Sequence, residues 1–177
     1  MGMKSKNRSK SPNRYIAISL YRTPYQHSKM SPQKRIKMFS TRSSVGKTIR
    51  VVQLKPSEGR VLYDTTFRKL HYMKGDLPKQ ASDIFVARDS KNTTHAILAV
   101  RHNCHPNAHI VSRWVSRTPG YGNPLLIAVA KKYTERKQRF SLATKKECVA
   151  QKLRSSCMWA EGVYNKKSRL FSFSFVV

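Results

Sequence analysis

The chain has no acidic residue before Glu58, although Lys and Arg recur throughout the segment that precedes it. Like charges repel one another, and no carboxylate in this segment compensates them. The segment also offers little apolar surface whose burial could offset the entropy of folding. Residues 1–44 are therefore predicted to be a basic extension without an independent fold, and residues 45–177 a single domain.

The charge of the whole chain indicates a polyanionic partner. The 36 Lys and Arg outnumber the 8 Asp and Glu, so that the 177 residues carry a net charge of +28. This imbalance is typical of proteins that bind nucleic acid through phosphates, and the interleaved Tyr and His rings of the extension suit stacking on unpaired bases. The expected partner is RNA, ribosomal RNA above all, together with neighbouring proteins of a large particle. The predicted RNA contacts are Lys4, Lys6, Arg8, Lys10, Arg14, Arg22, Lys34, Arg35, Lys37, Arg42, Lys47, Lys131, Lys132, Arg136, Lys137, Arg139, Lys145 and Lys146.

The first half of the domain has the pattern of strands. Segments 47–54 and 60–67 are rich in β-branched residues and flank a Pro-Ser-Glu-Gly turn, which predicts a hairpin. A second strand pair is expected at 83–88 and 93–100, and a further strand at 109–115.

The second half contains the helix signals. Asn123 followed by Pro124 is typical of a helix start, and predicts a helix from Pro124 to about Arg139. A capping box at 144–147 predicts a second helix, and the period-two pattern at 171–175 predicts a closing strand buried on one side. The expected fold is α+β: a small, mostly antiparallel sheet with two helices in the C-terminal half and a C-terminal strand.

Three patterns resemble sites for metal binding, catalysis or phosphate binding, but none of them has the full pattern of such a site. Zinc's preferred ligand types gather at His102, Cys104, His105 and His109, but no Cys-x-x-Cys pair is present, so zinc binding is left open and no metal site is predicted. Adjacent residues such as Cys104 and His105 point to opposite faces of a strand and form no catalytic dyad. Gly-Lys-Thr at 46–48 lacks the earlier glycine and the following helix of a phosphate-binding loop.

These patterns favour a protein that is not an enzyme and has no catalytic residues, cofactor or small-molecule substrate. The sequence predicts a structural RNA-binding component of a large ribonucleoprotein, most of all a ribosomal protein. The alternative is a small viral coat protein with a basic genome-binding arm. A nuclear factor and an enzyme rank below both.

The expected location is the ribosome, with a mitochondrial one favoured over a cytoplasmic one because the N-terminal composition resembles that of import presequences. No membrane contact is predicted, since no apolar stretch approaches the roughly twenty residues of a membrane helix.

Overall fold

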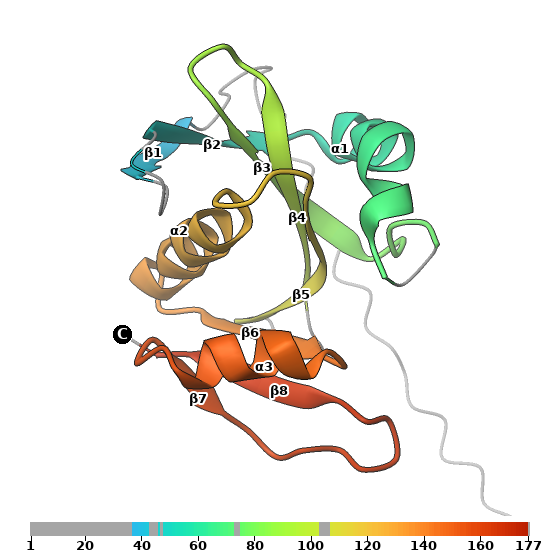
Figure 1. Ribbon diagram of the computed structural model, residues 1–177, viewed down its shortest axis with the longest axis vertical. Helices are drawn as coiled ribbons and strands as arrows, with labels where there is room; N and C mark the ends of the chain where they lie inside the picture. The colour runs from blue at the N-terminus through green and yellow to red at the C-terminus, as the bar shows by residue number, and fades with distance from the viewer. Residues whose placement is uncertain (1–36, 43–45, 47, 73–74, 103–106, 177) are drawn as a thin grey trace, which may run out of the picture. The chain divides into compact units, whose positions relative to one another are not determined.

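The computed structural model describes residues 37–42, 46, 48–72, 75–102 and 107–176, and residues 34–177 form one compact unit. Eight strands are present in these ranges: β1 Lys37–Arg42, β2 Thr48–Leu54, β3 Ala81–Arg88, β4 Thr94–His102, β5 Ala108–Ser116, β6 Arg139–Thr144, β7 Trp159–Glu161 and β8 Phe171–Phe175 (Figure 1). The α-helices are α1 Pro56–Leu62, α2 Gly122–Glu135 and α3 Glu147–Arg154. Helix α1 continues into a π-helical turn at Tyr63–Phe67 and a 3-10 turn at Arg68–Leu70.

The strands form one mixed sheet in the order β1-β2-β3-β4-β5-β6-β8-β7. Neighbouring strands are antiparallel except β5 and β6, which run parallel. A parallel pair requires a crossover connection, and α2 supplies it. The predicted α+β class is confirmed, with the correction that the described sheet is mixed.

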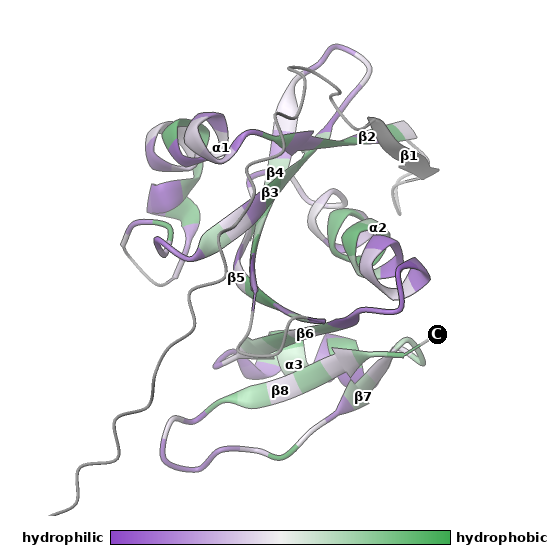
Figure 2. Ribbon diagram, turned by 180° about the vertical axis from the view of Figure 1, so that it is seen from behind, coloured by the Kyte–Doolittle hydropathy of each residue, from purple (hydrophilic) through white to green (hydrophobic). Residues whose placement is uncertain are grey.

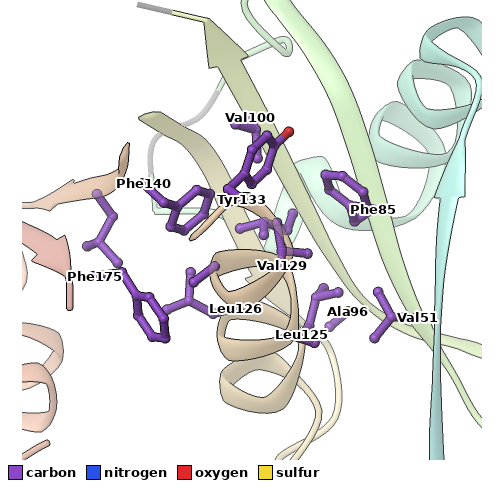
Figure 3. Packing of buried hydrophobic residues seen from close by; sticks show 14 of the residues in the cluster. Val51, Phe85, Ala96, Val100, Leu125, Leu126, Val129, Tyr133, Phe140 and Phe175 are labelled. Carbon is purple, nitrogen blue, oxygen red and sulfur yellow. The ribbon is translucent and has the colours of Figure 1, made fainter. Parts of the chain in front are cut away.

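Helix α2 packs on one face of the sheet. Its Leu125, Leu126 and Val129 are fully buried against inward-facing residues of the strands, among them Phe85 and Val100 (Figure 3). Figure 2 shows hydrophobic turns along the middle of α2 and a hydrophilic C-terminal end. The helix is anchored by a buried face that runs from Leu125 to Tyr133.

Helix α1 and the turns after it cover part of the opposite face, where the sequence pattern predicted a second strand. Tyr63 and Phe67 lie one helical turn apart and are fully buried with Ile84 and Val86. Gly59 allows the close approach, because a Cβ there would lie 2.6 Å from Ile84. The predicted hairpin of 47–54 and 60–67 is wrong in its second strand, since tertiary packing overrides β-propensity in a segment that opens with a proline.

The other predicted elements fared better. Strands at 83–88, 93–100 and 109–115 are confirmed as β3, β4 and β5. The predicted helix 124–139 starts close to its expected position but ends at Glu135, because the chain turns at Lys137, whose φ is 57°. The closing strand is confirmed, with Phe173 and Phe175 buried and Phe171 partly buried.

Among the described residues, every helix is too short or too polar to cross a lipid bilayer.

Candidate functional site

Strands β5 and β6 are paired only where both begin. Three residue pairs join them, from Ala108 with Arg139 to Ile110 with Ser141. Beyond this point β5 pairs only with β4, and β6 only with β8. The facing edges of the two strands therefore leave backbone N–H and C=O groups available to a ligand that carries amide groups.

A cleft of about 510 Å³ opens between the separated strands. One wall comes from β5 and the start of α2, and the other from β6, the residues after it and α3. The lining also includes Leu70, the last residue of the 3-10 turn, and the two residues after it, His71 and Tyr72. The lining residues used below are His71, Ser116, Gly122, Ala143, Lys145 and Lys146.

The loop from Arg117 to Tyr121 brings the N-terminus of α2 to this cleft. Gly120 has a φ of 86°, a conformation that glycine adopts without strain. Gly122 packs tightly, since a Cβ there would lie 3.1 Å from Ser116 Cβ, and its carbonyl accepts a 3.0 Å hydrogen bond from Trp114 Nε1.

The first turn of α2 can receive an anion. Backbone N–H groups in a first helical turn have no intrahelical partner, and no side chain caps this turn. Tyr121 at the N-cap is held in place by His95, whose ring stacks on it at 4.1 Å. His95 also hydrogen bonds to Thr118 at 2.9 Å. The loop is thus held by side-chain contacts, and the uncapped first turn begins at Gly122, which lines the cleft, an arrangement suited to phosphate.

Basic side chains surround the same opening. Arg101, Arg113, Lys145 and Lys146 line the cleft. Lys146 Nζ lies 5.0 Å from the ring of Tyr72, so that the wall after β6 meets the segment that follows α1. The cleft therefore favours an anionic ligand over a neutral one.

Among the described residues that line the cleft, His71 is the only imidazole and none is a carboxylate. The side chain is buried. An imidazole is the side chain best matched to proton transfer near neutral pH, which makes His71 the candidate general base of the cleft.

A second group of polar side chains lies on the α2 face, at the end of the sheet near the C-terminus of α2. Asp83 accepts hydrogen bonds from Tyr133 Oη at 2.7 Å and from Gln53 Nε2 at 2.9 Å. Burial, followed by the hydrogen bond to Asp83, raises the pKa of Tyr133, so its hydroxyl keeps its proton and remains a donor. Burial lowers the pKa of the neighbouring His109.

Lys132, one of the predicted RNA contacts, is buried in this region. Its Nζ donates to Gln53 Oε1 at 2.8 Å and lies 4.7 Å from the centre of the Phe85 ring. Burial and, after it, the charge of Arg136 lower the pKa of Lys132 to about 8, against a smaller opposing effect of Asp83.

The pKa of Lys132 predicts a stability that rises with pH. Because the folded pKa of about 8 lies below the ordinary lysine value of 10.5, the cost of burying the charge is fully present below pH 8 and disappears as pH rises toward the unfolded value. Replacing Lys132 by Met should stabilise the fold near neutral pH by about 1–2 kcal/mol after the lost hydrogen bond is subtracted, and should flatten the rise. Urea unfolding of both proteins between about pH 7 and pH 10 measures this. The exposed Lys131→Met is the control, and a less stable Lys132→Met at neutral pH contradicts the assignment.

The structure separates the sequence-predicted site residues. Lys4, Lys6, Arg8, Lys10, Arg14, Arg22, Lys34, Arg35 and Lys47 lie outside the described residues, and Lys37 and Arg42 lie on β1 without described side chains. Exposed positions are occupied by Lys131, Arg136, Lys137, Arg139, Lys145 and Lys146. Only Lys145 and Lys146 of this set line the cleft.

The possible zinc ligands are also divided. His102 and His109 face each other across β4 and β5, whereas Cys104 and His105 lie outside the described residues. Sequence reasoning missed the cleft itself. The available signal was a strand followed by a loop with two glycines and a helix, which is a common phosphate-binding arrangement.

No protein-family model matches this chain, and no curated protein is similar to it in sequence. Solved structures do resemble it in fold. The GNAT domain of S. lividans PAT superposes with a TM-score of 0.58 at 13% identity, over 79% of this chain and 97% of that one. A GNAT-family acetyltransferase from Bacillus anthracis gives 0.55 at 12% identity, over 80% and 98%. N-Acetylglutamate synthase from Neisseria gonorrhoeae, in complex with coenzyme A and L-arginine, gives 0.51 at 13% identity, over 73% of this chain and 33% of that one.

These similarities correct the function expected from the sequence. The matched structures of this fold are acyltransferases. They contradict the prediction of a ribosomal or other structural RNA-binding component and the alternative of a coat protein. They also contradict the prediction of a chain that is not an enzyme and has no small-molecule substrate. The net charge led to the RNA interpretation, but charge reports on partners and solubility and not on fold. The ribosomal location, with a mitochondrial ribosome favoured over a cytoplasmic one, stays a prediction. The chain has the GNAT fold.

Proposed function

We propose that this chain is an acyl-CoA-dependent N-acyltransferase. The observation that carries the proposal is the separation of the parallel strands β5 and β6 beside the uncapped N-terminus of α2. Fold similarity raises the expectation but does not identify a function, since one fold serves many activities. The proposal therefore depends on whether the cleft suits the substrate.

The chemical groups of coenzyme A match those of the cleft. Its phosphates require backbone N–H donors and cations, which the first turn of α2 and Arg117 can supply. Its pantetheine arm carries amides in an extended chain, and the unpaired edge of β5 after Ile110 offers matching donors and acceptors. The cleft volume of about 510 Å³ is within the range of small-molecule sites, roughly 300–1,000 Å³.

The reaction then follows from the placement of the side chains. An acceptor amine that has lost its ammonium proton attacks the thioester carbonyl carbon, a C–N bond forms, and the C–S bond breaks. His71 takes the proton that the nitrogen loses, and coenzyme A leaves as a thiolate that is protonated afterwards. Unpaired backbone N–H groups of β5 can stabilise the negative charge that develops on the carbonyl oxygen.

Acetyl-CoA binding tests the proposal directly. Isothermal titration of the full chain with acetyl-CoA should give one site per chain and a dissociation constant between about 1 μM and 1 mM. Ala143 is exposed on β6 and lines the cleft, so Ala143→Trp should fill the cleft and weaken binding at least about tenfold.

Ala160→Trp is the matched control, because Ala160 is exposed on β7 and does not line the cleft. Its affinity should equal that of the unchanged protein. A folded chain that binds no acetyl-CoA, or that binds it equally well with Trp at position 143, would exclude this cleft as the acyl-CoA site. Thiol release in the presence of amine acceptors then measures the transfer itself.

A further inference from the structure

Three metal-ligating side chains meet at the end of the sheet under α2. His102, at the end of β4, pairs with His109 at the start of β5, and Asp83 lies on the neighbouring strand β3. One ligand atom from each of the three lies within 4.8 Å of the other two. His102 Nε2 and Asp83 Oδ2 are 3.8 Å apart. Residues that are distant in the sequence are thus brought together by strand register.

His109 gives an independent reason to expect a ligand. Its side chain is 1% exposed, and neither ring nitrogen has a hydrogen-bond partner among the described residues. Its ring contacts those of Tyr133 at 4.2 Å and His102 at 4.6 Å between centroids, which satisfies no nitrogen lone pair. Buried polar atoms are rarely left unpaired, because the lost hydration costs about 1–3 kcal/mol. A bound cation would occupy the free lone pair.

The separations require only small adjustments to hold an ion. Metal–ligand distances of about 2.0–2.2 Å place the ligand atoms of a tetrahedral site about 3.4 Å apart. The side chain of His102 is 54% exposed, so its ring can rotate toward the other two ligands.

The carboxylate is already oriented by outer contacts. Gln53 donates to its Oδ1 and Tyr133 to its Oδ2, and each oxygen retains a lone pair for a metal. Lys132 donates to Gln53 and not to Asp83, so it does not occupy the carboxylate. This arrangement resembles the second layer of hydrogen bonds that orients ligands in metal sites.

We propose that Asp83, His102 and His109 bind one divalent transition-metal ion of the zinc class. Two imidazoles and one carboxylate are a ligand set that zinc accepts, with a fourth position left to water or another group. None of the three lines the cleft between β5 and β6, so the proposal does not depend on acyl transfer.

The site is tested in the absence of acyl-CoA by adding metal ions to the full chain after a chelator has removed any bound metal. Titration with Zn²⁺ should give one ion per chain and raise the melting temperature, and Co²⁺ should produce the visible absorption of a tetrahedral site. His102→Ala, at an exposed position, should remain folded and lose at least about tenfold in affinity. Tyr133→Phe removes the hydrogen bond to Asp83 and should weaken binding about tenfold.

Two controls separate this site from other metal ligands. His95 lies on β4, the strand of His102, and its imidazole is hydrogen bonded to Asp89 and Thr118. His95→Gln removes this imidazole and should leave the affinity for Zn²⁺ unchanged. Replacing the exposed thiols of Cys148 and Cys157 by Ser should also leave it unchanged. Equal affinity of the unchanged chain and His102→Ala, no binding at all, or loss of binding in the Cys variant would overturn the proposal.

Discussion

Replacing Val129 by Asp is expected to abolish folding. Val129 is fully buried on α2 within the cluster that joins the helix to the sheet (Figure 3). A carboxylate there would have no partner, and such buried unpaired charges cost about 4 kcal/mol or more, which is a large share of the roughly 5–15 kcal/mol that stabilises a domain. Circular dichroism during heating should show no cooperative transition.

Ile127→Asp on the same helix is the matched control. Ile127 is only half-buried. The new carboxylate can reach solvent there, so we expect a lowered melting temperature with folding retained. If Val129→Asp melts like the unchanged protein, the packing of α2 described above is incorrect.

Replacing His71 by Gln should reduce kcat for acyl transfer by about 10²–10⁴-fold, because general-base catalysis contributes factors of that size. KM for acetyl-CoA should change little, since the phosphates and the pantetheine arm are bound by other groups. The pH profile carries the more specific signal. The rise in rate as an imidazole loses its proton should disappear in the variant.

Because His71 is buried, thermal unfolding of the variant is the control for an effect of the substitution on the fold. A variant with the melting temperature of the unchanged protein cannot owe its slow rate to misfolding. A variant that keeps its rate and the same rise with pH would show that another group accepts the proton. The acetyl-CoA titration of the same variant separates this outcome from a failure of the cleft assignment.

The sequence predicted those elements whose pattern is set by local rules. Phe171, Phe173 and Phe175 alternate with serines and form the closing strand, since a period of two leaves one interpretation. Tyr63 and Phe67 were predicted to lie on a strand, but they are helical. Their helical conformation depends on packing against β3. Propensity cannot anticipate such a contact.

The candidate site was hidden for a different reason. The cleft uses backbone groups of β5 and the first turn of α2, and backbone groups leave little trace in residue type. Asp83 and His109 come together only through the register of three strands, which the sequence does not state. Lys132 was among the predicted RNA contacts, but it is buried because the helix turns that side chain toward Gln53 and Phe85.

The short junction between β5 and β6 also bears on cooperativity. Within the described sheet, only three residue pairs join the part formed by β1 to β5 to the part formed by β6, β8 and β7, with α2 as the additional connection. Regions linked by few hydrogen bonds can open as separate units at a free energy below that of global unfolding. A molecule bound along the facing edges of β5 and β6 would join the two parts of the sheet. Binding in the cleft would therefore determine whether these two parts unfold together or separately.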